Sequence, residues 1–204
     1  WIHRGFLAVT EKVLRRKGKK PGTQEKRGRF NVKKTIKDRP QEVENRETFG
    51  HWELDTMVSS RGQSKGCLAT FVERKTRFYV AIKMDDRTKD SMFLAISSLY
   101  NTLTSKLLKT FTVDRGKEFA CFEQVETEFG IPMYFADTYA AWQRGSNENS
   151  NGLLREFFPK KTDLAKVTLD KLTEALMLIN NRPRKCLGFK TPFDMFKHEI
   201  RKLI

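Results

Sequence analysis

The sequence has few cysteines and few histidines, three of each among 204 residues. Cys67, Cys121 and Cys186 are odd in number and lie far apart, and no histidine stands at a spacing from them that suits a zinc knuckle. The sequence therefore indicates neither a disulfide framework nor a structural zinc site.

Long hydrophobic runs are also absent. No segment approaches the roughly 20 apolar residues that a membrane-spanning helix needs, and no charged and then apolar leader opens the chain. These absences argue against a transmembrane protein and predict a soluble, intracellular one. The chain begins at Trp1 rather than Met, so we expect its natural N-terminus, and any upstream domain, to lie outside this sequence.

Acidic residues are in deficit, with 25 Asp and Glu against 40 Lys and Arg, which gives a formal net charge of +15. An excess of this size predicts attraction to a polyanion. Nucleic acid is the leading partner class, and an anionic membrane surface is the rival. The chain is 38% hydrophobic with 16 Phe, which is enough for one packed core.

Most of the excess charge lies in residues 1–48, which hold 15 basic and 6 acidic side chains. Glycine and proline interrupt this stretch without apolar periodicity, so we interpret it as a basic arm or linker at the end of an upstream DNA-binding region. The alternatives are a solvated tail and a nuclear localisation signal, because basic clusters are not specific. Its candidate phosphate contacts are Arg15, Arg16, Lys17, Lys19 and Lys20.

Residues 49–204 have the pattern of one α/β domain. Alternating and β-branched segments predict three consecutive strands, typical of an antiparallel meander, and strands then alternate with amphipathic helices, which favours parallel additions to the sheet. Thr168 and Thr191 precede the last two helices as N-caps. The expected strands are 51–59, 67–73, 77–84, 109–114 and 132–135, and the expected helices are 88–103, 118–129, 146–158, 169–180 and 192–203.

Three acidic residues stand out by their context. Asp55 lies in the first expected strand, Asp114 ends the fourth, and Glu148 lies near the start of the helix that follows the fifth. Each alone has an ordinary structural explanation, as a turn residue or a helix-dipole partner. Together they form the kind of carboxylate cluster that Mg²⁺ requires, because this ion takes oxygen ligands and keeps positions open for phosphate.

The motifs around these residues resemble a known family. HWELD at 51–55, VDRG at 113–116 and NEN at 147–149 are similar to the DDE catalytic core of retroviral integrases and bacterial transposases. The stretch WQRGSNENSNGLLR at 142–155 and the closing NNRPRKCLGFKTP at 180–192 resemble the IS-thirty family of bacterial insertion-sequence transposases.

That resemblance implies an α/β fold of the RNase H-like, retroviral integrase type, with a five-stranded mixed sheet flanked by helices. It implies that Asp55, Asp114 and Glu148 are both the catalytic residues and the ligands of two divalent ions, Mg²⁺ with Mn²⁺ able to substitute. In such sites the two ions activate the attacking oxygen and stabilise the leaving one. Water would first free a 3′-hydroxyl at the transposon end, and that hydroxyl would then attack target DNA.

The resemblance also suggests DNA contacts near Glu148. Asn151 and Arg155 follow it on roughly the same helix face, with a local cap and a solvated charge as the alternatives. Arg144, Lys160 and Lys161 are weaker candidates for phosphate contact. We expect Trp52 and Trp142 to serve core or loop packing rather than base stacking, and Phe157 and Phe158 to pack the helix onto the sheet.

The leading hypothesis is a DDE transposase core that acts on transposon ends and target DNA in the bacterial cytoplasm, at the nucleoid. Joining two ends to one target implies a homodimer or a larger assembly on DNA. The alternative is a noncatalytic DNA-binding or regulatory fragment of a transposase. A nuclease of the RNase H type ranks below both, because it shares the metal chemistry but not the motif at 147–149.

Overall fold

The computed structural model describes residues 32–60, 62, 64–138 and 140–203. The arm residues Arg15, Arg16, Lys17, Lys19 and Lys20 lie outside this part of the chain. Within it, no helix is both long and apolar enough to cross a bilayer.

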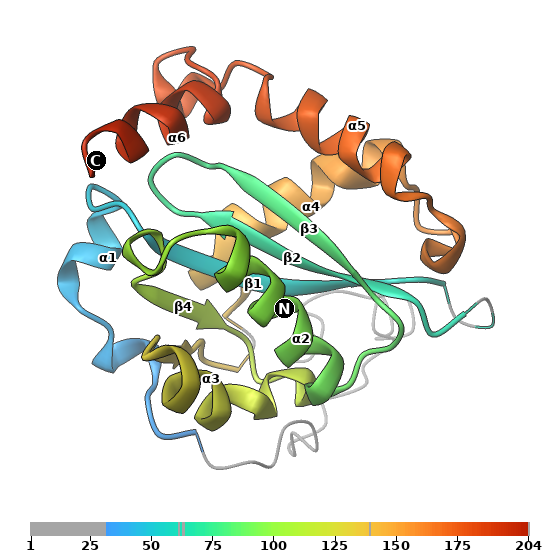
Figure 1. The fold of residues 1–204 in the computed structure, drawn as a ribbon, viewed down its shortest axis with the longest axis horizontal. Coiled ribbons are helices and arrows are strands. Elements are labelled where there is room, and N and C mark those ends of the chain that lie inside the picture. The colour runs from blue at the N-terminus through green and yellow to red at the C-terminus, as the bar shows by residue number, and fades with distance from the viewer. Residues whose placement is uncertain (1–31, 61, 63, 139, 204) are drawn as a thin grey trace, which may run out of the picture.

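Five strands form one mixed sheet with the order β3-β2-β1-β4-β5 (Figure 1). The first three strands are antiparallel neighbours, and β4 and β5 add to the sheet in parallel with β1. The predicted meander with parallel additions is confirmed. The strands are β1 (His51–Val58), β2 (Cys67–Glu73), β3 (Tyr79–Met84), β4 (Thr110–Val113) and β5 (Met133–Phe135).

The alternation in β1 divides its side chains between the two faces of the sheet. Trp52 and Leu54 are fully buried in one hydrophobic cluster, and Met57 is buried in the other. Glu53 and Asp55 share the face of Met57, because successive residues of a strand point to opposite sides. This face is therefore where the polar residues of β1 meet the rest of the molecule.

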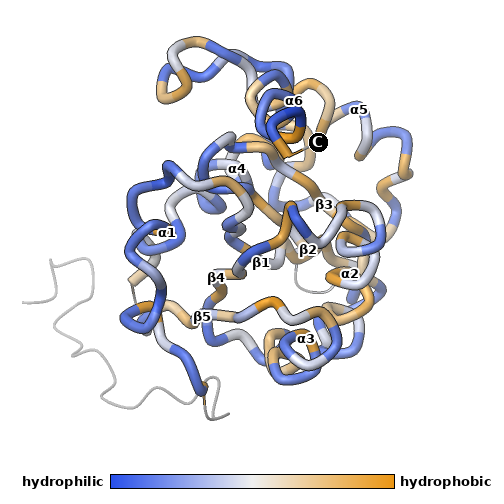
Figure 2. The backbone as a smooth tube through the Cα atoms, turned by 60° about the vertical axis from the view of Figure 1, so that its left-hand side comes forward, coloured by the Kyte–Doolittle hydropathy of each residue, from blue (hydrophilic) through white to orange (hydrophobic). Residues whose placement is uncertain are grey.

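Helices cover both faces of the sheet. In Figure 2, α2 and α3 lie on one side of it, and α4 and α5 lie toward the other side. Leu154 of α4 and Ile179 of α5 are buried in the second cluster, with Leu68 and Val72 of β2. The helices are α1 (Gln41–Asn45), α2 (Lys89–Thr102), α3 (Phe122–Phe129), α4 (Gly145–Phe157), α5 (Leu169–Asn180) and α6 (Pro192–Arg201).

Short 3-10 turns connect these elements. They are η3 (Ile36–Asp38), η4 (Ser105–Leu107), η5 (Lys117–Cys121), η6 (Ala141–Arg144), η7 (Leu164–Lys166) and η8 (Lys185–Leu187). The helix expected over residues 118–129 is thus only partly α-helical, because its first turn is η5, with a bond from Phe119 N to Gly116 O at 3.0 Å. Thr168 and Thr191 cap α5 and α6 as predicted.

Residues 32–48, which the sequence analysis assigned to the arm, pack against the sheet. The backbone N–H of Phe135 donates to Lys34 O at 3.0 Å, and Thr35 forms a parallel bridge with Phe135. Arg39 is buried and donates to the Thr112 hydroxyl at 3.2 Å, and Val43 of α1 is 1% exposed. The packed part of the chain therefore begins before residue 49.

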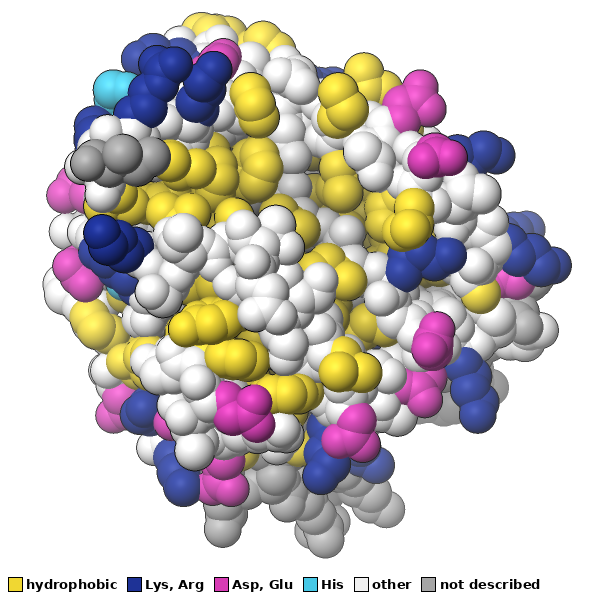
Figure 3. Space-filling view, in the orientation of Figure 1, with side chains coloured by type: hydrophobic (Ala, Val, Ile, Leu, Met, Phe, Trp, Pro, Cys, Tyr) yellow, Lys and Arg dark blue, Asp and Glu magenta, His cyan; other side chains and the backbone are white. Residues whose placement is uncertain are grey.

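The C-terminal helix α6 is anchored by an aromatic cluster. The Phe196 ring stacks on Phe78 with centroids 4.0 Å apart and meets Phe49 and Trp52 edge-on. Figure 3 shows hydrophobic side chains gathered beneath α6, with the charged side chains mostly toward the rim of this face. Apolar burial therefore holds α6 to the domain.

The aromatic predictions are confirmed for two residues and wrong for two. Trp52 is fully buried and donates from Nε1 to Leu107 O at 2.9 Å, and Phe158 is buried in the second cluster. Trp142 on η6 is 75% exposed, and Phe157 is 40% exposed. Phe157 is the last residue of α4 and Phe158 is its C-cap, with backbone angles that are no longer helical, so the two side chains point in different directions.

Candidate active site

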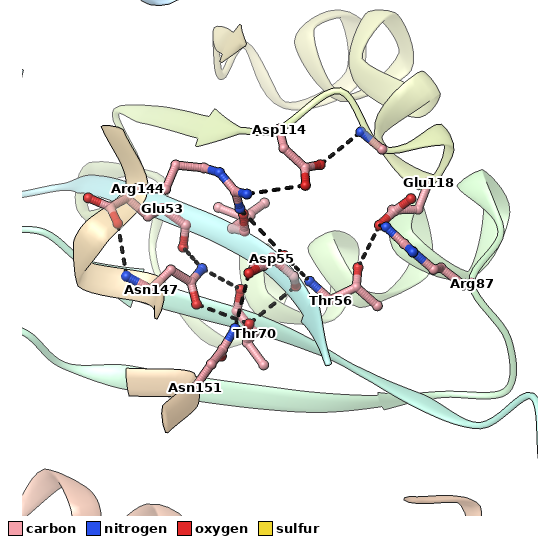
Figure 4. A network of polar contacts seen from close by, with 12 residues as sticks. Glu53, Asp55, Thr56, Thr70, Arg87, Asp114, Glu118, Arg144, Asn147 and Asn151 are labelled. Atoms are coloured by element: carbon pink, nitrogen blue, oxygen red, sulfur yellow. Dashed lines mark hydrogen bonds and ion pairs between the residues drawn. The ribbon is translucent and has the colours of Figure 1, made fainter. Parts of the chain in front are cut away.

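Asp55 and Asp114 come together where β4 ends beside the central strand β1. Asp55 lies in β1 and Asp114 directly follows β4, the parallel neighbour of β1, so the two carboxylates end up side by side. The guanidinium of Arg144, at the end of η6, lies between them, with Nη1 3.4 Å from Asp55 Oδ1 and Nη2 3.1 Å from Asp114 Oδ2 (Figure 4). Two neighbouring strands thus place two carboxylates next to the guanidinium of Arg144.

Asp55 is a partly buried acid, with 26% of its side chain exposed. Burial raises its pKa above the usual range, the nearby Arg144 opposes that rise, and the negative charge of Asp114 adds to it. Its Oδ1 accepts the backbone N–H of Thr56 at 2.8 Å, and its Oδ2 accepts from Asn151 Nδ2 at 3.1 Å. The Arg144 guanidinium therefore favours the ionised form of Asp55 against the effect of burial.

Asn151 on α4, which bonds Asp55, is itself oriented by a hydrogen bond from Tyr79. The hydroxyl of Tyr79 donates to Asn151 Oδ1 at 2.7 Å, which directs the amide N–H₂ of Asn151 toward Asp55. Burial raises the pKa of Tyr79, so this hydroxyl stays protonated and acts as a donor. Asn151, which the sequence suggested as a DNA contact, here holds a carboxylate.

A second buried acid lies beside Asp114. Glu118 accepts from the Thr56 hydroxyl at 3.0 Å and from Arg87 Nε at 2.6 Å, and its side chain is 2% exposed. Gly116 lies in the turn that connects it to Asp114, and a Cβ at this position would meet the Glu118 carboxylate at 2.5 Å, so a larger residue there would displace that carboxylate. The backbone N–H of Gly116 also donates to Asp114 Oδ1 at 2.8 Å, so one turn fixes both acids.

Glu148 does not join the aspartates in this arrangement. It is exposed on the first turn of α4, one helical turn after Arg144. Within the described ranges, no group of three or more His, Cys, Asp or Glu side chains is placed to hold a metal ion. The structure therefore brings together two of the three predicted ligands and leaves the third on the adjacent helix.

The donor set nevertheless fits a divalent cation. Carboxylate oxygens are the ligands that Mg²⁺ prefers, and two of them already converge on a shared positive group. The Arg144 guanidinium balances the negative charge of Asp55 and Asp114, at the position where a bound metal ion would balance it. Glu148, in the first turn of α4, is the remaining predicted ligand that could complete the set.

The other predicted DNA contacts are dispersed. Arg155 donates to the backbone carbonyls of Val58 at 2.8 Å and Phe158 at 3.4 Å. Lys160 and Lys161 are exposed after α4. Arg144 contacts carboxylates rather than open surface, and its Nη1 also donates to Leu54 O at 3.2 Å. That these residues contact DNA stays a prediction.

Sequence reasoning missed several buried polar residues of the site. Glu53 and Asn147 are both fully buried and bonded to each other, and Glu118 pairs with Arg87. One signal was available for Glu53, because it alternates with Asp55 and so lies on the same face of the strand. Glu118 and Arg87 are 31 residues apart, and nothing local marks them as partners.

Comparison with known proteins assigns the chain to a family. Residues 45–141 match the model of the integrase core domain, a range that contains Asp55 and Asp114. The chain is 37% identical over 187 residues to the transposase InsI of insertion sequence element IS30A from Escherichia coli K12, covering 91% of this chain and 48% of that protein. The chain belongs to the IS-thirty (IS30) family of transposases.

Other members of the family agree. The chain is 36% identical over 199 residues to the transposase of insertion sequence element IS4351 from Bacteroides fragilis, which covers 94% of this chain and 59% of that protein. This IS-thirty family chain thus spans about half the length of the curated relatives it matches.

Solved structures show the fold of this family member. The catalytic core domain of BIV integrase superposes with a TM-score of 0.59 at 19% identity, over 77% of this chain and all of that one. The HTLV-2 integrase catalytic core, solved in complex with magnesium, gives 0.55 at 18% identity, over 72% of this chain and 95% of that one. The RNase H-like fold expected from the sequence is confirmed.

Proposed function

We propose that the chain is the catalytic core of a DDE transposase that cuts the ends of an insertion sequence and joins them to target DNA. The observation that carries this proposal is the convergence of Asp55 and Asp114, from adjacent parallel strands, on one cation. Membership of the IS-thirty family and the formal net charge of +15 support DNA as the substrate.

In this proposal Asp55, Asp114 and Glu148 hold two divalent ions, Mg²⁺ or Mn²⁺. When bound, these ions would lower the pKa of an attacking water or hydroxyl and stabilise the leaving oxygen. Asn151 keeps the Asp55 carboxylate in a fixed orientation. The turn at Gly116 does the same for Asp114.

The rest of the expected function follows from the chemistry. The cut frees a 3′-hydroxyl, and that hydroxyl is the nucleophile for joining, so no covalent intermediate with the protein is required. Two ends joined to one target call for at least a homodimer on DNA. The substrate places the protein on bacterial DNA in the cytoplasm.

The test is a strand-transfer assay with labelled transposon-end DNA and Mn²⁺. Asp55→Asn, Asp114→Asn and Glu148→Gln should each reduce cleavage and joining to background, because each removes a charged ligand, and each should leave DNA binding within about twofold. The matched controls are Asp170→Asn and Glu156→Gln, which change exposed acids on α5 and α4 and should retain activity.

Two results would contradict the proposal. Retained strand transfer in all three variants would remove the acidic residues from the reaction. Absence of cleavage and joining by the unchanged chain at every Mn²⁺ concentration, with DNA binding intact, would favour the noncatalytic DNA-binding fragment.

A further inference from the structure

Helix α4, which carries Glu148, is capped by a residue from the sheet. The residue at its N-cap position, Arg144, makes no capping bond from its side chain, so the first N–H groups of the helix need other acceptors. The Glu53 carboxylate of β1 accepts the backbone N–H of Asn147 at 2.9 Å. A carboxylate at a helix N-terminus is also favoured by the helix dipole.

The side chain of Asn147 makes the reverse connection. Its Nδ2 donates to Glu53 O at 2.9 Å and to Thr70 O at 3.4 Å, and its Oδ1 accepts from the Thr70 hydroxyl at 3.1 Å. Glu53, Asn147 and Thr70 are all fully buried. The first turn of α4 is therefore bonded to the backbones of both β1 and β2 (Figure 4).

The charge of Glu53 is compensated inside the protein. Arg74, 3% exposed at its side chain, forms an ion pair with Glu53 and donates from Nε to Val43 O at 3.1 Å. Arg77 donates from Nη1 to the Ser146 hydroxyl at 2.7 Å and to Arg74 O at 2.7 Å. Removing one partner of such a buried pair leaves an uncompensated charge.

The contacts along β1 and α4 are in register. Glu53 meets Asn147, and two residues further along the strand Asp55 meets Asn151, four residues further along the helix. Two strand residues advance about 6.7 Å and four helical residues about 6 Å, so both contacts can form at once. Glu148 is the residue next to Asn147, and its position relative to Asp55 follows from this register.

We propose that Glu53 is a positioning residue that fixes the start of α4 against β1 and thereby sets the distance of Glu148 from Asp55. The proposal rests on the function proposed above. The hydrogen bonds between Glu53 and Asn147 hold the N-terminus of α4 in place. Glu148 therefore reaches the aspartates by rotation of its own side chain, and α4 does not slide along the sheet.

The decisive experiment measures Mn²⁺ affinity of the full chain without DNA in four proteins: the unchanged chain, Glu53→Ala, Glu148→Gln and the double variant. Glu53→Ala should weaken Mn²⁺ binding about tenfold, as loss of a residue that orients a metal ligand does. In the Glu148→Gln background the same change should alter binding by no more than about twofold, because Glu53 acts through Glu148.

A structural control separates positioning from general loss of stability. Met92→Ala creates a cavity in α2 on the other face of the sheet, and it should leave Mn²⁺ affinity unchanged at the temperature of the assay. Amide hydrogen exchange at residues 146–148 should accelerate at least about tenfold in Glu53→Ala and not in Met92→Ala. A second double variant, Glu53→Gln with Arg74→Gln, keeps an acceptor for the backbone N–H of Asn147 without a buried charge. It should recover most of the Mn²⁺ affinity that Glu53→Ala loses.

Equal weakening of Mn²⁺ binding by Glu53→Ala in both backgrounds would overturn the proposal, since Glu53 would then act independently of Glu148. No weakening in either background would overturn it as well. Neither readout uses turnover. Failure of strand transfer by the unchanged chain would therefore count against the proposed function and leave the measurement on Glu53 valid.

Discussion

Arg144 supplies the positive charge that Asp55 and Asp114 share in the protein without metal. Two neighbouring carboxylates repel each other, and the guanidinium between them offsets that repulsion. A divalent ion bound by the same oxygens would have to replace Arg144. The residue that stabilises the metal-free site is thus a competitor of the metal.

Changing Arg144 should therefore separate stability from metal binding. Arg144→Gln should lower the Tm of the metal-free protein by about 3 °C, because a partly exposed ion pair contributes about 1 kcal/mol. Mn²⁺ should raise the Tm of this variant more than that of the unchanged chain, since no guanidinium competes. Thermal unfolding with and without Mn²⁺ measures both effects.

The control for this prediction is Arg155→Gln. Arg155 is a half-buried arginine of α4, and it donates to the backbone carbonyls of Val58 and Phe158 rather than to carboxylates. Its Tm increase with Mn²⁺ should equal that of the unchanged chain. The same Mn²⁺ response in all three proteins would show that Arg144 does not compete with the metal.

His51 at the start of β1 makes stability depend on pH. Burial lowers its pKa from 6.5 to about 4, and its Nδ1 lies 2.8 Å from the Thr110 hydroxyl. A lowered folded-state pKa favours the neutral imidazole, so its contribution is present above pH 6.5 and is lost as pH falls through about 4. The full effect is about 3 kcal/mol.

His51→Gln should remove this pH dependence. Between pH 7 and pH 4 the free energy of unfolding of the unchanged chain should fall by about 3 kcal/mol more than that of the variant, measured by urea unfolding. His198→Gln, at an exposed position on α6, serves as the comparison and should follow the unchanged chain. Parallel curves for His51→Gln and the unchanged chain would disprove the assignment.

At the scale of elements, α6 depends on one aromatic residue. Phe196 is 5% exposed and contacts three other aromatic rings, whereas Phe193 of the same helix is 46% exposed. Phe196→Ala should cost about 3–5 kcal/mol of unfolding free energy, the usual range for a buried Phe. Urea unfolding of Phe196→Ala and Phe193→Ala compares the two, and equal losses would contradict the anchoring role.

The elements were predictable because their signals are local. Period-two alternation placed β1 from residue 51, and threonines before α5 and α6 marked their first turns. Trp142 was wrongly assigned to packing because composition alone does not say which face of a loop is covered. In η6 the next two side chains point into the protein, because Gln143 bonds Asp137 and Arg144 pairs with Asp55 and Asp114, and Trp142 is left exposed.

The site was predictable only in part for the same reason. Asp55 lies within β1 and Asp114 directly follows β4, so a strand order that makes these two strands neighbours brings the two residues together. The bond from Asn147 to Glu53 spans 94 residues, and the contact of Arg144 with Asp114 spans 30. Such contacts depend on how α4 and η6 pack on the sheet, which no local pattern encodes.

At the scale of the whole molecule, the charge is uneven along the chain. Residues 1–48 hold 15 basic and 6 acidic side chains, and the remainder carries its acids in the midst of 25 basic residues. The described surface shows both signs dispersed around the rim of one face (Figure 3). We therefore expect the arm, rather than the folded domain, to dominate nonspecific attraction to DNA.

Salt dependence of DNA binding tests this expectation. Changing Arg15, Arg16, Lys17, Lys19 and Lys20 to Gln should reduce the slope of log affinity against log salt by up to about 4.5, since each neutralised phosphate contributes about 0.9. The control set changes five exposed lysines of the folded domain to Gln, with the same loss of charge: Lys106, Lys166, Lys171, Lys190 and Lys197. It should leave the slope nearly unchanged, because the phosphate contacts of the arm would remain. Equal slopes for the two variants would mean that total charge, and not the arm, holds the DNA.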